Sequence, residues 1–197
     1  PDAYSTAKKA GIKVLYGVEI YLLGEEIHKA DGKLDYKNCD FYHAILLVKN
    51  QTGLKNLYKL ISESHLDYFY KTPRVPKSLL AKYREGLILG SACEAGEVYK
   101  AILLQKREDD LLKVASLYDY LEIQPLGNNR FLIDSGAVTG YEQLKEINQR
   151  IIELGRQLGK PTVATCDVHF LDPEDEAFRR ILQAGRGFDD ADRQAPL

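Results

Sequence analysis

Short apolar runs rich in β-branched and aromatic residues recur along the chain and predict five strands. In chain order they are residues 11–23, 42–50, 86–91, 120–125 and 161–170. The polar, turn-prone stretch at 22–40 separates the first two strands and predicts a loop or a short hairpin.

Apolar residues at helical spacing predict helices between these strands. One apolar face in residues 53–69 is formed by Leu54, Leu57, Leu60 and Ile61. The best amphipathic pattern spans 140–159, and a last helix at 172–185 opens with Asp172 as N-cap and Pro173 at its first position. Shorter helices are expected at 4–10, 77–85, 94–105 and 108–118.

The order of these elements favours an α/β fold. Strand followed by helix, repeated, predicts a mainly parallel sheet with helices outside it. Both an α/β barrel and an open doubly wound sheet fit this order. The sequence contains neither a G-x-G-x-x-G fingerprint nor a P-loop, which weakens the open nucleotide-binding sheet.

Composition agrees with a folded globular chain of one domain. The 197 residues are 45% hydrophobic and 28% charged, which is not typical of a disordered segment. No apolar run approaches the length of a membrane span, and no secretion leader is visible. The chain starts at Pro1, so we interpret it as a fragment. Three cysteines without a sign of export favour a reduced, cytoplasmic setting.

The net charge of the chain limits how it could bind nucleic acid. A net charge of −2 argues against bulk electrostatic capture of DNA or RNA. A local basic patch at 70–84 remains an alternative to a solvated loop that enters a helix. From their charge and loop position alone, Arg74 and Lys77 are candidates to contact a phosphate or DNA.

The stretch "TCDVHF" (165–170) carries the first candidate chemistry. On a strand, Asp167 and His169 share one face and Cys166 points to the other. Side chains at strand ends build the sites of α/β barrels, and a carboxylate with an imidazole suits zinc, manganese or iron. The alternative is a chance D-x-H pair with no metal role.

Three further residues could act as ligands. Glu19 lies among apolar residues, so we expect a desolvated carboxylate that binds a metal or forms a buried ion pair. The alternative to a ligand role for His43 is a core or edge histidine. Because His43 opens its strand, a site requires either that this strand runs against its neighbours or that the strand begins elsewhere than predicted. Cys93 precedes a predicted helix, whose N-terminus would favour a thiolate ligand; the alternative is an inert buried thiol.

Several long motifs together resemble a known family. The stretches are "GVEIYL", "FYHAILLVKNQTGLKNLYKLISESH", "YREGLILGSACEAGEVY" and "KPTVATCDVHFLDPED", followed by the tail "RRILQAGRGFDDADRQAPL". In this order they are similar to the polymerase-and-histidinol-phosphatase (PHP) domain of the bacterial replicative DNA polymerase III α subunit, most closely the PolC type of Gram-positive bacteria. The resemblance covers nearly the whole chain.

This resemblance implies a fold and a ligand set. Members fold as a distorted (β/α)7 barrel, bind up to three metal ions, and include relatives that hydrolyse phosphoesters. Residues 1–197 would form the C-terminal portion of such a domain, without its N-terminal strands. The positions that match family ligands are Glu19, His43, Cys93, Asp167 and His169.

Two departures accompany the resemblance. The family's first motif, an H-x-H, would lie before Pro1, which leaves a three-metal centre incomplete here. PolC-type chains also carry an exonuclease between the strand of Glu19 and the strand of His43, where this chain has only residues 22–40.

The function implied is that of one module in a replicative polymerase that synthesises DNA from deoxynucleotides with magnesium. The module would perform metal-dependent phosphoesterase or 3'–5' exonuclease-type hydrolysis; the alternative is a non-catalytic, metal-stabilised scaffold. Implied partners are DNA, the remaining polymerase domains, the sliding clamp and other replisome subunits, without a membrane. The polymerase's own catalytic aspartates would lie downstream of Leu197, so this fragment carries no polymerase site.

Overall fold

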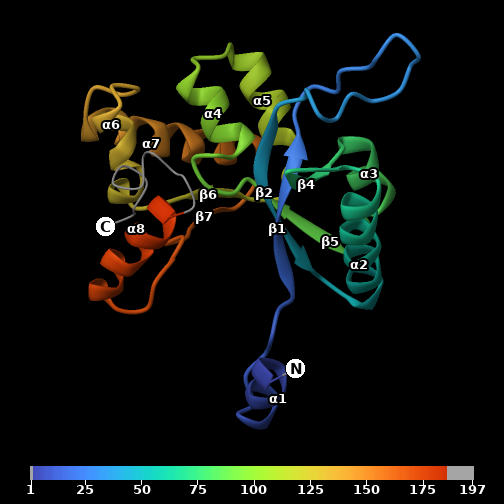
Figure 1. The fold of residues 1–197 in the computed structure, drawn as a ribbon. Coiled ribbons are helices and arrows are strands. Elements are labelled where there is room, and N and C mark those ends of the chain that lie inside the picture. Colours follow the sequence, from blue (N-terminus) through green and yellow to red (C-terminus); the bar gives the residue numbers. More distant parts are fainter. Residues whose placement is uncertain (1, 186–197) are drawn as a thin grey trace. The chain divides into compact units, whose positions relative to one another are not determined.

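The structure is a computed structural model that describes residues 2–185. Pro1 and residues 186–197, which include most of the tail that resembles the family, lie outside the described residues. The chain divides into two compact units, Pro1–Ala92 and Cys93–Leu197. The ribbon in Figure 1 follows the chain through both units.

The first unit is built on a mixed five-stranded sheet. Its strands follow the order β3-β4-β1-β2-β5. The pairs β1–β2, β2–β5 and β3–β4 are antiparallel, and β1–β4 is parallel. The elements are α1 (Asp2–Lys9), β1 (Gly17–Leu23), β2 (Phe41–Val48), α2 (Gln51–Leu66), β3 (Phe69–Tyr70), β4 (Thr72–Val75), α3 (Lys77–Lys82) and β5 (Leu87–Gly90).

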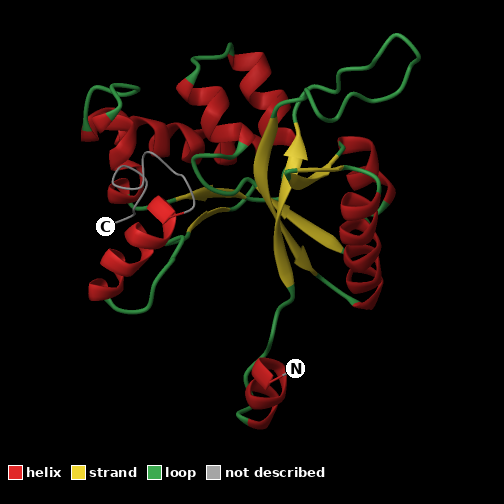
Figure 2. Cartoon of the chain, viewed as in Figure 1, coloured by secondary structure: helices red, strands yellow, loops and turns green. Residues whose placement is uncertain are grey.

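The expectation of a mainly parallel sheet is wrong for this unit. Parallel neighbours need a long crossover, usually a helix, whereas β1 and β2 are joined by the loop at 24–40 (Figure 2). An isolated antiparallel bridge between His28 and Leu34 confirms the hairpin-like character of this loop. The strand predicted at 11–23 begins only at Gly17, and the predicted loop at 70–84 contains all of β4.

One face of the sheet forms the core of the first unit. Period-two alternation buries Ile20 and Leu22 on β1, Ala44 and Leu46 on β2, and Leu89 on β5. Helix α2 contacts β2, β4 and β5 and contributes the buried Leu57 and Leu60. The opposite face carries Glu19 and His43, so the alternation that builds the core also leaves these two side chains accessible.

The second unit packs helices around a two-stranded parallel sheet, β6–β7. Helix α7 contacts α4, α5, β6 and β7. It buries a stripe at helical spacing formed by Leu144, Ile147, Ile151 and Leu154. The elements are α4 (Glu97–Leu103), α5 (Glu108–Ser116), β6 (Leu121–Ile123), η1 (Leu126–Asn129), α6 (Arg130–Asp134), α7 (Tyr141–Leu158), β7 (Thr162–Ala164), η2 (Pro173–Asp175) and α8 (Glu176–Gly185).

The end of the second unit differs from the predicted strand at 161–170. Strand β7 stops at Ala164, and a loop leads from it to η2 (Figure 2). The predicted helix start is confirmed, because Asp172 forms a capping box with Asp175 and Pro173 follows it. The first turn is a 3-10 turn that continues into α8.

At the level of fold class, the mixed α/β architecture is confirmed and a barrel is not. Within residues 2–185 the strands form one sheet of five and one sheet of two, which are not closed into a barrel. Among these residues no helix has the length and apolar character needed to cross a bilayer.

Candidate metal-binding site

Strands β1 and β2 bring the first two candidate ligands together. In their antiparallel register Glu19 pairs with Ile45 and Tyr21 with His43, which makes Glu19 and His43 diagonal neighbours on one face. His43 Nδ1 lies 3.2 Å from Glu19 Oε1. The position of His43 at the start of its strand therefore fits a site, since β2 runs against its neighbours.

The predicted burial of Glu19 is wrong. Its side chain is 42% exposed, and that of His43 is 27% exposed. The residues directly before and after Glu19, Val18 and Ile20, point to the other face of the sheet, as period-two alternation requires. The carboxylate is thus accessible to an ion from solvent.

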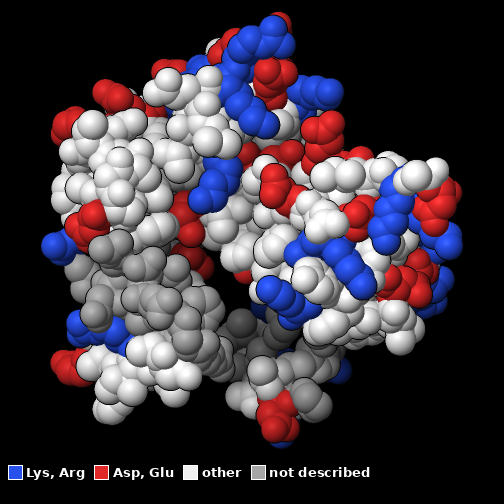
Figure 3. Space-filling model, turned by 45° about the horizontal axis from the view of Figure 1, so that its top comes forward, with Lys and Arg blue, Asp and Glu red and all other residues white. Residues whose placement is uncertain are grey.

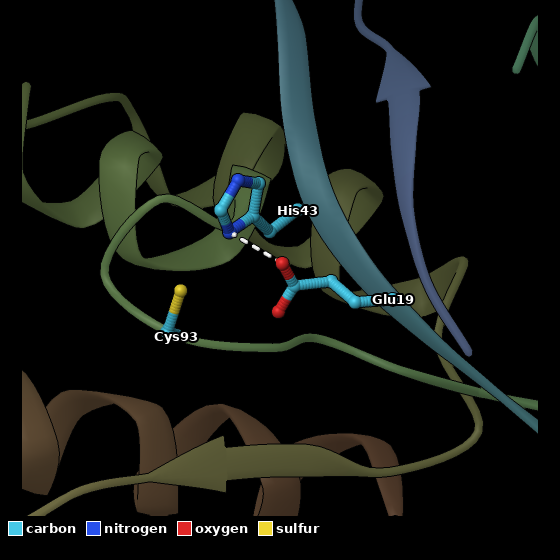
Figure 4. A group of neighbouring side chains, drawn as sticks. All are labelled: Glu19, His43 and Cys93. Atoms are coloured by element: carbon cyan, nitrogen blue, oxygen red, sulfur yellow. Dashed lines mark ion pairs between the residues drawn. The ribbon is translucent and has the colours of Figure 1, made fainter. Parts of the chain in front are cut away.

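Cys93 completes a group of three possible ligands. It follows the loop that leaves β5 and is joined by a peptide bond to Ala92, the last residue of the first unit. The possible ligand atoms of Glu19, His43 and Cys93 all lie within 4.8 Å of one another. Figure 4 shows these side chains directed at the same space, with the thiol opposite the imidazole and the carboxylate.

The helix predicted to begin beside Cys93 starts later. Helix α4 begins at Glu97 with Gly96 as its N-cap, so no helix N-terminus lies at the thiol. Cys93 is instead buried, at 9% exposure, and it follows Ala92, whose φ is 58°. A left-handed φ is uncommon for alanine, and here it turns the chain sharply at the point where the thiol is presented.

The chemistry of this group fits a divalent transition metal. A carboxylate oxygen, an imidazole nitrogen and a thiolate sulfur are all ligands of zinc, with bonds of about 2.0–2.3 Å. Two ligand atoms of one such ion lie at most about 4.6 Å apart, close to the upper limit of 4.8 Å within which these atoms lie. Imidazole and carboxylate also suit manganese and iron.

A second group of three lies within the second unit. Possible ligand atoms of Cys93, Glu94 and Asp167 lie within 4.8 Å of one another. Asp167 is not on a strand, so the argument that placed it on one strand face with His169 is wrong. It lies three residues after β7, with φ of 51°, in the left-handed region that aspartate tolerates better than most residues.

His169 lies beside Asp167 without joining this group of three. Its Nδ1 is 3.9 Å from Asp167 Oδ1 and 2.6 Å from the Asp167 carbonyl oxygen. Because a carbonyl oxygen only accepts, Nδ1 must carry the proton of that hydrogen bond. The lone pair of a neutral ring is then on Nε2, which can bind a metal while Nδ1 donates to the backbone acceptor.

Two titrating groups interact with the carboxylates of the second set. Burial raises the pKa of Tyr99, and the negative charge of Glu94 raises it further. Burial lowers the pKa of Arg179, whereas the negative charge of Asp167 acts in the opposite direction. The carboxylates of Glu94 and Asp167 therefore influence titrating groups from α4 and α8.

The two basic residues predicted to contact phosphate have different surroundings. Arg74 is only 6% exposed, and its Nη1 donates to the carbonyl oxygens of Tyr36, Lys37 and Cys39. This inward direction does not fit a contact with phosphate. Lys77 opens α3, and its role stays a prediction. On the face shown in Figure 3, basic and acidic side chains lie interspersed.

Sequence reasoning missed Glu94. The signal was available, because Glu94 directly follows Cys93 and precedes α4. It was overlooked because the stretch was interpreted as the start of a helix, where an acidic residue needs no further explanation.

Similarity to known proteins extends over most of the chain. The family model of the PHP domain matches residues 1–134. The DNA polymerase III PolC-type of Clostridium perfringens (strain 13 / Type A) is 59% identical over 166 residues, which are 84% of this chain and 12% of the relative.

Two further relatives carry the same description. The protein of Caldanaerobacter subterraneus subsp. tengcongensis is 52% identical over 190 residues, 96% of this chain and 13% of the relative. That of Bacillus subtilis (strain 168) is 49% identical over 164 residues, 83% of this chain and 11% of the relative. The chain thus spans roughly an eighth of the length of these relatives.

Proposed function

Since the chain belongs to the PHP domain family, we propose that it is the PHP module of a PolC-type replicative DNA polymerase III and hydrolyses phosphoesters with bound metal ions. The names of relatives at 49–59% identity support the polymerase part of this proposal. The parent protein would synthesise DNA from deoxynucleotides with magnesium, in the cytoplasm. Its partners would be DNA, the other polymerase domains, the sliding clamp and further replisome subunits.

The observation that carries the hydrolytic part is the convergence of Glu19, His43 and Cys93. These residues come from separate segments, and no local structure requires a carboxylate, an imidazole and a thiol to meet. The group of Cys93, Glu94 and Asp167 supplies further ligand atoms, with His169 beside Asp167. We assign Glu19, His43, Cys93, Asp167 and His169 as the ligands of zinc, manganese or iron.

The chemistry follows from these roles. When bound, the ion polarises a phosphoryl oxygen and lowers the pKa of a coordinated water, which supplies a nucleophile at neutral pH. Glu19 and His43 contact each other across β1 and β2, so the sheet fixes their separation. His169 donates from Nδ1 to a backbone carbonyl, which keeps Nε2 available for the ion.

We also propose that the strands of this chain are part of a distorted β/α barrel, of the type that the family forms. In this arrangement Glu19 and His43 would face the interior. The face of β1 and β2 that carries them is the less buried one in the first unit, which supports this direction.

The first test is the metal content of the purified chain by elemental analysis, with His43→Ala and His169→Ala alongside. We expect at least one equivalent of metal in the natural chain and metal affinity lowered at least about tenfold in each variant. His28→Ala is the matched control, because it removes an exposed imidazole from the loop at 24–40.

Hydrolysis is tested with single-stranded DNA and a small phosphomonoester as substrates. Asp167→Asn should abolish activity while the chain remains folded. Stoichiometric metal without hydrolysis of either substrate, together with lower stability in Asp167→Asn, would instead favour the scaffold role. A chain that holds no metal would contradict the proposal.

A further inference from the structure

The loop that carries Asp167 is held by side chains of the second unit that are not ligands themselves. It leaves β7 at Ala164, and the next residue still belongs to the strand pairing, because Thr165 N donates to the Ile123 carbonyl oxygen at 3.0 Å. Beyond Thr165 the chain leaves the sheet, and side chains of β6 and η1 hold the loop by hydrogen bonds.

The first of these contacts comes from η1. Asn128 Nδ2 donates to the carbonyl oxygen of Cys166 at 2.8 Å. This carbonyl belongs to the planar peptide that joins Cys166 to Asp167, so fixing its direction restricts φ of Asp167. That φ is 51°, which a non-glycine residue adopts only where its surroundings favour it.

The second contact comes from β6. Thr165 Oγ1 donates to Glu122 Oε2 at 3.0 Å. Glu122 is 7% exposed and lies within the strand that pairs with β7, so its carboxylate is a fixed acceptor. Two residues before Asp167, the side chain and the backbone of Thr165 are therefore both anchored to β6.

The peptide on the other side of Asp167 is held as well. Its carbonyl oxygen accepts from His169 Nδ1 at 2.6 Å. Both peptides that flank Asp167 thus have their carbonyl oxygens in hydrogen bonds, one from Asn128 and one from His169. With both peptide planes fixed, the carboxylate leaves the backbone in a defined direction.

We propose that Asn128, and Thr165 together with Glu122, are positioning residues that aim the Asp167 carboxylate at a bound metal ion. This inference rests on the proposed function of Asp167 as a ligand. None of the three needs to touch the ion. Their effect is to restrict the directions that the carboxylate can take, and hydrogen-bonded supports of this kind alter metal affinity by about 10–100-fold.

The chain offers a matched control for Asn128. Asn148 Nδ2 donates to the Gln124 carbonyl oxygen at 2.9 Å, so it makes the same kind of bond within the same unit. That bond joins α7 to the residue after β6 and does not involve the loop at 165–170. Loss of either amide removes one hydrogen bond to a backbone carbonyl, but only one of the two supports Asp167.

The experiment titrates Mn²⁺ into the purified 197-residue chain and follows binding by calorimetry, with Asp167→Asn marking the ion that depends on Asp167. We expect Asn128→Ala and Thr165→Val to weaken binding of that ion at least about tenfold. Asn148→Ala and Thr165→Ser, which keeps the hydroxyl, should stay within about twofold of the natural chain. Urea unfolding without metal should show similar small losses of stability for Asn128→Ala and Asn148→Ala.

The possible results separate the two proposals. If Asp167→Asn loses an ion that Asn128→Ala and Thr165→Val retain at natural affinity, the positioning inference is overturned and the proposed function stands. Equal weakening of Mn²⁺ binding by Asn148→Ala would show that the effect comes from general stability. That result would also overturn the positioning inference. If the natural chain binds no Mn²⁺, or Asp167→Asn binds it unchanged, the ligand role of Asp167 fails and the inference fails with it.

Discussion

The side chain of Arg74 holds the loop between β1 and β2 from the inside. Its Nη1 lies 2.5, 3.0 and 3.0 Å from the carbonyl oxygens of Tyr36, Lys37 and Cys39. The guanidinium carbon lies 4.8 Å from the ring centroid of Phe41, where a cation gains from the aromatic face. One buried cation thus satisfies three backbone acceptors that would otherwise need water.

This arrangement predicts a large effect of Arg74→Met, which keeps an apolar stem and removes every donor. We expect the free energy of unfolding to fall by about 2–4 kcal/mol, because three partly buried carbonyls lose a charged donor. Urea denaturation measures this. Arg107→Met is the control, since Arg107 forms an exposed pair with Asp110 and should change stability by less than about 0.5 kcal/mol. Equal effects of the two substitutions would contradict a structural role for Arg74.

At the residue scale, the sequence could predict the residue types of the site, but not the burial or the backbone conformation of the individual residues. Five candidate ligands followed from the family resemblance, and their order along the chain was sufficient for that. The burial of Arg74 was not predictable, because its partners are backbone carbonyls more than thirty positions away. The left-handed backbone of Asp167 was not predictable either, because the apolar run before it resembles a strand that continues through this residue.

Among the elements, the start of α2 packs unusually closely against the turn before β5. A Cβ atom on Gly53 would lie 1.8 Å from the Gly86 carbonyl oxygen, so neither position has room for a side chain. Gly86 also has φ of 75°, which favours glycine. Asn50 caps the helix at this point by accepting from Gly53 N at 2.9 Å.

The close approach predicts that Gly86→Ala is more harmful than backbone strain alone. We expect a loss of at least about 3 kcal/mol, because strain of about 1–2 kcal/mol adds to a clash with backbone atoms of Gly53. Gly32→Ala is the matched control in the same unit, with φ of 79° and nothing within 4 Å of the added Cβ. Its cost should be about 1–2 kcal/mol in urea denaturation. Similar losses for both variants would show that contact with α2 is unimportant.

Long periodic elements were predictable, and the elements that were missed are all short. Helix α7 was predicted at 140–159 and spans Tyr141–Leu158, because its apolar stripe extends over many turns. Strand β4 was missed, since Pro73 and Pro76 suggested a loop; it pairs with β1 only at Arg74 and Val75. The helical turns at 126–134 were missed as well, being too short for a period to emerge.

For the molecule as a whole, the candidate ligands are far apart in sequence, from Glu19 to His169. An ion held by such residues binds only the folded chain, because the unfolded chain does not bring them together. Binding of this kind stabilises the folded state by an amount that grows with ion concentration.

Removal of metal should therefore lower the melting temperature. At an ion concentration about 100 times Kd the stabilisation is about 2.7 kcal/mol. For a chain of this size that corresponds to about 5–10 °C. Thermal unfolding followed by circular dichroism, with and without EDTA, measures the shift. In Asp167→Asn the shift should shrink, and an unchanged melting temperature of the natural chain after chelation would contradict the prediction.

The base of the loop at 24–40 is closed by a hydrogen bond from Gly24 N to the Asp40 carbonyl oxygen, 2.9 Å long, directly where β1 and β2 stop pairing. Because the two ends of this loop are held together, a longer loop lowers stability only slightly. Each doubling of a flexible loop costs only about 0.6 kcal/mol of closure entropy. Evolution can therefore lengthen or shorten this loop with little effect on folding. The strands that carry Glu19 and His43 keep their register throughout such changes, because that register is set by the sheet and not by what the loop contains.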